Sequence, residues 1–157
     1  MPESFKMRVK RWGFNFFPAY RATGGRLTYI ADDFHEIHIK LPLSWRTRNY
    51  VGTIYGGSMY GAVDPLYMVM LIKILGNGYV VWDKAATIRF KRPGHETLYA
   101  EFKVTPEEVA EIKDELTRTR SIERIYSIKL VNQAGKVHAV IEKTIYITSR
   151  TRAQAAD

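Results

Sequence analysis

The stretch from residue 49 to residue 75 reads NYVGTIYGGSMYGAVDPLYMVMLIKIL, and this stretch decides the fold. From about Gly57 to Leu75 it is almost wholly apolar, which predicts a helix enclosed by the rest of the protein. Asp64-Pro65 and Lys73 interrupt the run, so we expect no membrane insertion. Gly76-Asn77-Gly78 supplies residues that tolerate positive φ and ends the helix.

Segments with the pattern of strands flank this helix on both sides. Two alternating runs precede it, joined by a turn at Asp32-Asp33; Leu27, Tyr29 and Ala31 form one face of the first run. A polar loop, 43–53, leads into the helix. The sequence predicts strands at 26–31, 36–41, 79–91, 97–104, 124–131 and 136–148, and further helices at 4–14, capped by Ser4, and at 106–118.

This order of elements predicts an α+β architecture, with an antiparallel sheet wrapped around one long central helix. We expect a single domain over residues 1–150 and a disordered tail over 151–157. One twisted sheet cannot enclose a helix and also hide both of its edges. A homodimer is therefore the expected state, with a homotetramer as the alternative.

Composition excludes several classes of function. The chain has 157 residues, no cysteine and a formal net charge of +8. A disulfide framework and a Cys nucleophile are excluded, and the absence of cysteine and of an opening secretory signal favours a cytoplasmic location. The basic residues are dispersed and lack a nucleic-acid-binding motif, so we expect no nucleic-acid partner. The four histidines have no metal-ligand spacing, and we expect neither a metal nor a cofactor.

Residues 49–64 also carry a spaced motif. Its members are Asn49, Gly52, Thr53, Gly56, Gly57 and Asp64. This pattern resembles the signature of the hotdog-fold acyl-CoA thioesterases similar to the phenylacetate-pathway enzyme, in which His-Gly-Gly precedes an acidic residue. Tyr55 stands where that family usually has His, which points to an uncharacterised branch. The resemblance covers roughly residues 26–148 and implies a hotdog fold.

Two parts of the motif bear directly on chemistry. Gly56-Gly57 lets the backbone approach a ligand closely, and unpaired amides at a helix start can hold a thioester carbonyl and the oxyanion formed from it. The resemblance implies that the Gly57 amide, or its neighbour, is that donor. It also implies that Asp64 acts as nucleophile or general base, and the sequence does not choose between these roles.

Structural interpretations of the same residues stay open. Gly57 and Gly61 also suit close packing of the helix against a sheet. Asp64-Pro65 also suits a kink at which Asp64 caps a restarted turn.

Five further residues are assigned to substrate binding, namely Tyr55, Gly56, Ser58, Lys84 and Arg92. Ser58 has no His in a triad order, which favours a role at the helix N-terminus. Lys84 either lies at the pocket or pairs with Asp83. Asn49 is assigned to catalysis because it orients water or substrate in the family, with an Asn-capped turn as the alternative.

These observations predict hydrolysis of an acyl-CoA thioester. The acyl chain would lie beside the central helix, and basic residues would meet the nucleotide. The alternative is a non-catalytic hotdog protein that binds acyl-CoA or lipid.

Overall fold

The computed structural model describes residues 3–151, so all but the first residue of the expected tail lies outside the described residues. The helices are α1 (Phe5–Phe16), α2 (Pro18–Thr23), α3 (Gly56–Val63), α4 (Leu66–Leu75) and α5 (Pro106–Arg118). The strands are β1 (Arg26–Ile30), β2 (Glu36–Leu41), β3 (Tyr79–Phe90), β4 (Leu98–Lys103), β5 (Ser121–Val131) and β6 (Val137–Ser149). Each predicted element is present, and α2 is an additional helix that begins at Pro18.

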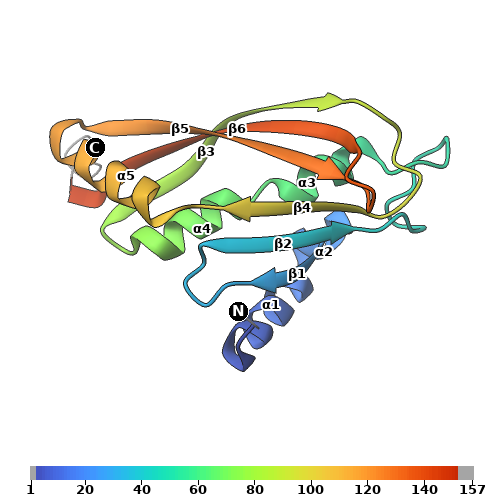
Figure 1. Cartoon of the computed structure of the whole chain (residues 1–157), viewed down its shortest axis with the longest axis horizontal. Coiled ribbons are helices and arrows are strands. Elements are labelled where there is room, and N and C mark those ends of the chain that lie inside the picture. Colours follow the sequence, from blue (N-terminus) through green and yellow to red (C-terminus); the bar gives the residue numbers. More distant parts are fainter. Residues whose placement is uncertain (1–2, 152–157) are drawn as a thin grey trace.

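Six antiparallel strands form one sheet in the order β1-β2-β4-β5-β6-β3. The sheet curves around α3 and α4, which lie between the β3 side and the β1 side (Figure 1). The predicted α+β class and the central helix are therefore confirmed. Apolar side chains from α4 and from the inner face of the strands form one core, including Leu66, Met70, Phe102 and Ile145.

The central helix is divided in two at Asp64-Pro65. Proline has no backbone N–H and therefore cannot continue the series of helical hydrogen bonds. Helix α4 begins with the hydrogen bond from the Val69 amide to the Pro65 carbonyl (2.9 Å). Residues 56–75 are long and apolar enough to cross a membrane, but half of that window is buried inside the protein. The prediction that the rest of the protein encloses the helix on all sides was wrong, because Ile72 and Lys73 of α4 are exposed.

The regular alternation expected in the first strand, with Leu27, Tyr29 and Ala31 on one face, is interrupted. Leu27 and Ile30 are buried, whereas Tyr29 lies beside the His38 ring at the surface. The pairing of β1 with β2 shifts between Leu27 and Tyr29. A bulge adds one residue to one strand and changes which side chains face inward, and strict alternation does not reveal it.

Helix α1 covers the free edge of β1. The Asn15 side chain accepts a hydrogen bond from the Leu27 amide (2.7 Å) and donates one to the Leu27 carbonyl (3.0 Å). Glu3 accepts from the Ile30 amide (3.2 Å). Ser4 caps the helix, as predicted, by accepting from the Met7 amide. Only the β1 edge has its backbone groups hydrogen-bonded in this way. Among residues 3–151, no strand or helix pairs with the outer side of β3.

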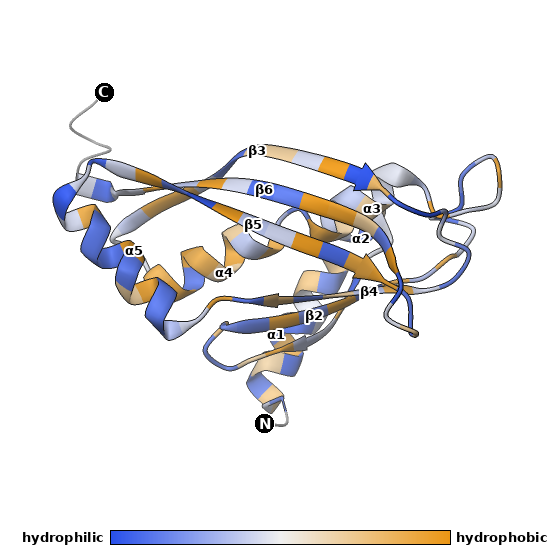
Figure 2. Cartoon of the chain, turned by 45° about the horizontal axis from the view of Figure 1, so that its top comes forward, coloured by the Kyte–Doolittle hydropathy of each residue, from blue (hydrophilic) through white to orange (hydrophobic). Residues whose placement is uncertain are grey.

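The second peripheral helix, α5, packs beside the far end of the sheet. Its Thr105 cap accepts from the Glu108 amide, and Val109, Ile112 and Leu116 form its buried stripe. Figure 2 shows this alternation of hydrophobic and hydrophilic residues around α5. The helix matches its prediction, whereas β5 begins at Ser121, three residues before the predicted start.

Candidate active site

Asp64 lies at the junction of α3 and α4, within a cluster of polar side chains. Its carboxylate accepts a hydrogen bond from the Tyr60 hydroxyl (2.6 Å) and forms an ion pair with Lys143 of β6. Lys143 also contacts the Asp83 carboxylate of β3 (3.2 Å). The Lys143 side chain is 1% exposed and that of Asp64 is 40% exposed. Asp64 is therefore anchored from the protein interior while remaining accessible from outside.

These contacts correct the structural interpretation of Asp64. The side chain does not cap α4, whose first turn has no side-chain cap. The kink is real, but its effect is to bring the carboxylate to Tyr60 and Lys143. The unpaired ammonium of the buried Lys143 would be costly, and the Asp64 carboxylate compensates it.

Burial and charge oppose each other within this cluster. Burial disfavours the ammonium of Lys143, but the hydrogen bond and charge of Asp64, together with Asp83, outweigh it and raise the lysine's pKa. Burial raises the pKa of Asp83 against the effect of Lys143, and one Asp83 oxygen (Oδ1) is buried without a hydrogen-bond partner. Burial, and then the hydrogen bond to Asp64, raise the pKa of Tyr60. The cluster thus holds a charged lysine between two carboxylates.

A bulge in β3 shapes the surface beside this cluster. The pairing with β6 shifts between Asp83 and Ala85, so that Lys84 is the extra residue. A depression of about 460 Å³ lies here. Its lining consists of Tyr60, Asp83, Lys84, Ala85, Ala86, Thr87 and Ile88. Lys84 therefore lies at a pocket, and its alternative pairing with Asp83 was wrong, because Lys84 pairs with Glu123.

The start of α3 presents two amides without partners. The Tyr55 carbonyl accepts from the amides of Ser58 (3.0 Å) and Met59 (3.1 Å), and in the described part of the chain nothing bonds the amides of Gly56 and Gly57. A Cβ on Gly57 would lie 2.3 Å from the Tyr55 ring, and one on Gly56 would lie 2.8 Å from the Phe90 ring. Both glycines therefore accommodate aromatic rings, and the amides remain potential donors at the edge of those rings.

Gly61 packs against a helix, and the expected sheet contact was wrong. A Cβ at Gly61 would meet Thr23 of α2 at 2.8 Å. Ala62 similarly approaches Gly25, just after α2, and the Tyr20 hydroxyl donates to the Ala62 carbonyl (3.0 Å). Small residues on α3 thus permit close contact with α2.

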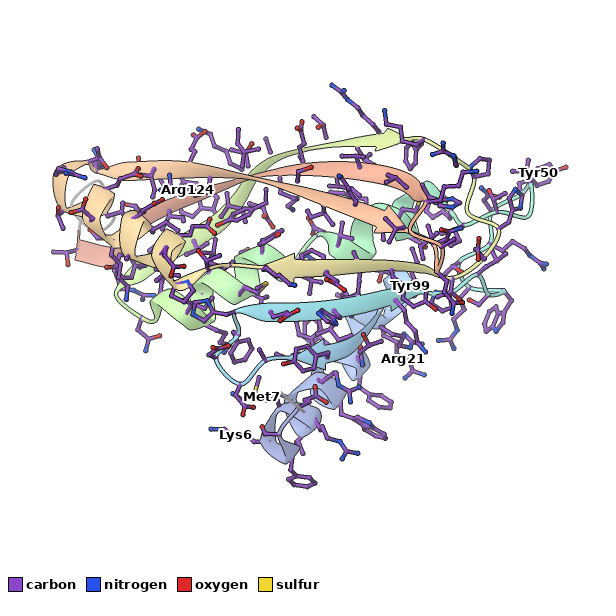
Figure 3. The ribbon with its side chains drawn as sticks, in the orientation of Figure 1. Lys6, Met7, Arg21, Tyr50, Tyr99 and Arg124 are labelled. Carbon is purple, nitrogen blue, oxygen red and sulfur yellow. The ribbon has the colours of Figure 1, made fainter. Side chains whose placement is uncertain are left out.

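Asn49 organises the loop before α3. Its side-chain oxygen accepts from the amides of Val51 (3.1 Å) and Thr53 (2.9 Å), and its amide group donates to the Thr53 hydroxyl (2.9 Å). The Asn-capped turn is therefore present. Tyr50 projects from the far end of this loop (Figure 3).

A second depression, of about 390 Å³, brings together several of the predicted residues. It is lined by Asn49, Thr53, Ile54, Gly56, Met59, Phe90, Lys91, Arg92 and Pro93. Arg92 donates to the Val137 carbonyl (2.7 Å), which holds it at this rim. The predicted residues therefore lie at two different depressions. Asn49, Gly56 and Arg92 line this one. Lys84 lines the other, as does Tyr60, which donates its hydrogen bond to Asp64. Ser58 is buried in the first turn of α3.

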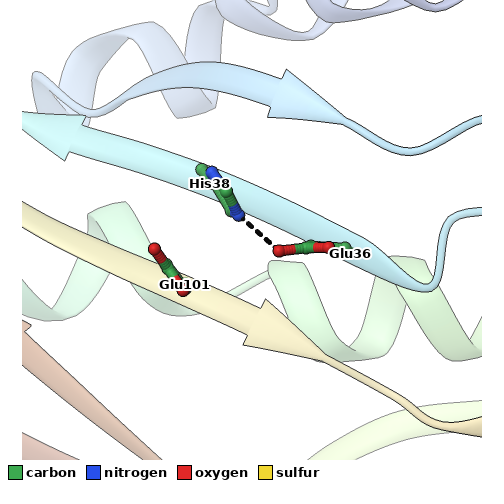
Figure 4. Close-up of side chains that lie close together, drawn as sticks. All are labelled: Glu36, His38 and Glu101. Atoms are coloured by element: carbon green, nitrogen blue, oxygen red, sulfur yellow. Dashed lines mark hydrogen bonds and ion pairs between the residues drawn. The ribbon is translucent and has the colours of Figure 1, made fainter. Parts of the chain in front are cut away.

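Potential metal ligands gather elsewhere, on the outer face of the sheet. Among residues 3–151, one group of suitable atoms lies within 4.8 Å, from Glu36, His38 and Glu101 (Figure 4). Lys103 contacts Glu36 (3.3 Å) and Glu101 (3.8 Å), so a cation already compensates both carboxylates. The hydrogen bond from His38, together with Lys103, holds the pKa of Glu36 below its usual value despite some burial. We therefore assign this group to ion pairing.

Sequence reasoning missed Lys143, Tyr60 and the part played by Asp83. Lys143 is in phase with Ile141 and Ile145, which are both fully buried on β6. A lysine at an inward position of an alternating strand is a signal that could have been found. Tyr60 precedes Asp64 by four residues, the spacing of neighbours on one face of a helix.

Comparison with known proteins places the chain in a family. Residues 7–147 match the family described as Domain of unknown function (DUF4442). The chain belongs to the DUF4442 family. No curated protein matches this DUF4442 chain in sequence.

Solved structures share the fold of this DUF4442 protein. A protein of unknown function from Pseudomonas aeruginosa, described as a probable thioesterase, has a TM-score of 0.80 at 18% identity, covering 96% of this chain and 99% of that one. A protein of unknown function from Chlorobaculum tepidum has a TM-score of 0.71 at 17% identity, covering 92% and 94%. A thioesterase from Haemophilus influenzae has a TM-score of 0.67 at 13% identity, covering 94% and 93%. The chain thus has the hotdog fold of these thioesterases.

Proposed function

We propose that this protein hydrolyses acyl-CoA thioesters, with Asp64 as the reactive carboxylate. The observation that carries the proposal is the position of Asp64, which is partly exposed and anchored by Tyr60 and Lys143. A carboxylate that is held in place but open to solvent can act on water or on a substrate carbonyl. The thioesterases among the solved structures with the same fold support the same class of reaction.

The reaction needs hydrogen-bond donors for the oxyanion as well as a carboxylate. Asp64 would take a proton from water as the water adds to the thioester carbonyl; the C–S bond would then break, and the proton held by Asp64 would pass to the leaving thiolate. The unpaired amides of Gly56 and Gly57 are the donors available for the oxyanion. Asp64 follows Gly57 by seven residues, about two helical turns or roughly 10 Å, so Asp64 of one copy would act with the glycine amides of a second copy if both are to reach one carbonyl. If Asp64 acts as nucleophile instead, water hydrolyses the resulting anhydride.

Basic and apolar groups around the second depression suit the remainder of the substrate. Lys91 and Arg92 lie beside Phe90, Met59 and Ile54 on its wall. Cationic side chains would meet the phosphates of CoA, while the apolar groups would contact the pantetheine or acyl carbons. The residue types in this lining support the assignment of Gly56 and Arg92 to substrate binding, with Asn49 holding the loop in place.

We further propose that the protein is a homodimer paired along β3. The edge of β1 is satisfied by α1, whereas the β3 edge exposes Ala85, Thr87 and Phe90. An open edge of this kind is a template for pairing with another chain. A partner in this position would cover the depression next to Tyr60 and restrict water beside Asp64.

Binding without hydrolysis is the second candidate. It is favoured by the Tyr55 ring over Gly57, because this ring restricts access to an amide that the reaction requires.

A panel of acyl-CoAs of different chain lengths, monitored with a thiol-detecting reagent, tests the proposal. We expect turnover on at least one member and saturation with concentration. Saturable acyl-CoA binding without any thiol release would establish the second candidate, and neither binding nor release would contradict both.

A further inference from the structure

Helix α1 has an apolar face that nothing within residues 3–151 covers. Phe5, Val9, Trp12 and Phe16 follow one another at the spacing of a helical stripe, and they are 80%, 57%, 63% and 53% exposed. Met7, on the opposite side, is buried. Figure 3 shows Met7 on the part of α1 nearest β1, and Lys6 projecting from the helix. The helix therefore buries one apolar side and presents a second one to solvent.

The stripe continues onto neighbouring segments. One depression is lined in part by Phe5, Val9 and Trp12, and the next by Trp12, Phe16 and Arg21. A third joins Phe16 and Arg21 to Trp45 and Arg46 of the loop before α3. Because successive depressions share residues, these side chains form one continuous surface, which we call the aromatic face.

Cations border this aromatic face and outnumber the acidic residues near it, of which Glu3 is paired with Arg11. Residues 4–31 include six basic residues and no Asp or Glu: Lys6, Arg8, Lys10, Arg11, Arg21 and Arg26. Arg11 is paired with Glu3 and Lys10 lies over the Phe34 ring, which leaves Lys6 and Arg8 on the helix without an acidic partner in the described structure. Arg21 lies over Phe16 (5.5 Å) and Arg46 over Trp45 (4.9 Å), so charge and aromatic rings are interleaved.

We propose that the aromatic face docks the protein onto the surface of an anionic phospholipid bilayer. A helix with exposed Trp and Phe on one side and Lys and Arg around them is suited to lie in the plane of the headgroups. The rings would enter the boundary between headgroups and acyl chains, and the cations would meet lipid phosphates. This docking leaves the chain on one side of the membrane and is independent of the proposed hydrolysis.

Charge also argues against a second copy of the chain at this face. A twofold contact through the same surface would bring Arg8 and Arg21 of both copies together without acidic partners, and like charges at an interface are unfavourable. Nucleic acid would satisfy the cations, but it would leave the fully apolar Phe5 and Val9 in contact with a charged backbone. An anionic bilayer satisfies both features.

Sedimentation of the full chain with vesicles tests the proposal. We expect binding to vesicles of equal parts phosphatidylglycerol and phosphatidylcholine, much weaker binding to phosphatidylcholine alone, and a decrease with added salt. Trp12→Ser combined with Phe16→Ser should reduce the partition coefficient by about tenfold or more. Ile125→Ser, at a 71% exposed position of β5, is the matched control and should bind like wild type.

The charged residues have their own test. Arg8→Glu with Arg21→Glu should abolish the preference for anionic vesicles, whereas Lys129→Glu with Lys113→Glu, at exposed positions elsewhere, should retain most of it. Thermal unfolding of every variant establishes that each is folded. Absence of vesicle binding, equal loss in the two controls, or binding of the aromatic face to RNA, DNA or a second copy in place of vesicles would overturn the proposal.

Discussion

Lys143 is a charged residue at a position of β6 where the neighbouring inward side chains are apolar. It lies between Ile141 and Ile145 in the buried series, and it compensates both Asp64 and Asp83. Removal of one partner from a buried ion pair leaves the other charge uncompensated. At the scale of single residues, the two carboxylates make a buried ammonium tolerable, since the Lys143 side chain is 1% exposed and that of Asp64 is 40% exposed.

We predict that Lys143→Met lowers the free energy of unfolding by about 2–4 kcal/mol. Urea unfolding of the variant and of wild type measures the difference, and Lys129→Met, at an exposed position of β5, is the control. The contribution of Lys143 also depends on pH. The pKa of Lys143 is raised in the folded state. Its contribution to stability is therefore complete below about pH 10.5, the usual pKa of lysine, and is lost as the pH rises through the raised pKa. A variant as stable as its control at neutral pH would contradict the assigned role of Lys143.

The sequence identified Asp64 and the loop residues before it as candidate site residues, but it did not predict which side chains they contact. Spacing along one segment identifies Asn49, Gly57 and Asp64, since these residues are close in the chain. Lys143 is 79 positions beyond Asp64 and reaches it only because β6 lies over the helix. Sequence patterns identify the face of a strand without identifying its contact across the core, and for this reason the cluster could not be predicted.

At the scale of elements, α1 performs two tasks on its two sides. Toward the protein it satisfies the edge of β1 through Asn15, and toward solvent it presents the aromatic face. The sequence predicted this helix, on which Phe5, Val9 and Trp12 form a stripe. It did not reveal that this stripe faces outward, because the buried Met7 side is the narrower one.

We predict that Asn15→Ala lowers the free energy of unfolding by about 1–2 kcal/mol, because the Leu27 amide loses its side-chain partner and the Leu27 carbonyl keeps only the longer bond from Arg11 (3.5 Å). Asn77→Ala, at an exposed turn position, is the control. Chemical denaturation of both variants provides the measurement. Equal stabilities would show that water replaces Asn15 at the β1 edge without cost.

Strand positions were predicted better than strand registers. The bulges in β1 and β3 each change the inward side chains within one strand, and the second of them makes Lys84 the extra residue at a depression. Neither strand contains a glycine or proline that would mark the irregularity. The register shift in each strand is therefore not visible in the local sequence.

At the scale of the whole molecule, the sheet leaves one edge open, and we predict a mass twice the 18.1 kDa of one chain by light scattering. Antiparallel pairing about a twofold axis would place residue i of one β3 opposite residue j of the other and j opposite i, so lysines at 85 and 87 would face lysines where the axis passes near Ala86. Ala85→Lys with Thr87→Lys should therefore yield monomers through charge repulsion. Ser127→Lys, at an exposed position of β5, should remain dimeric. A monomeric wild-type protein, or variants that are equally dimeric, would contradict pairing along β3.

The most direct test of the reactive carboxylate is a comparison of Asp64→Asn with Asp83→Asn. Each substitution removes one of the two carboxylates that contact Lys143, so effects on the ion cluster are matched. We predict that kcat/KM for the best acyl-CoA falls by about 100-fold or more in Asp64→Asn and by less than about tenfold in Asp83→Asn. Equal losses in the two variants, or full activity in Asp64→Asn, would contradict the assignment of Asp64.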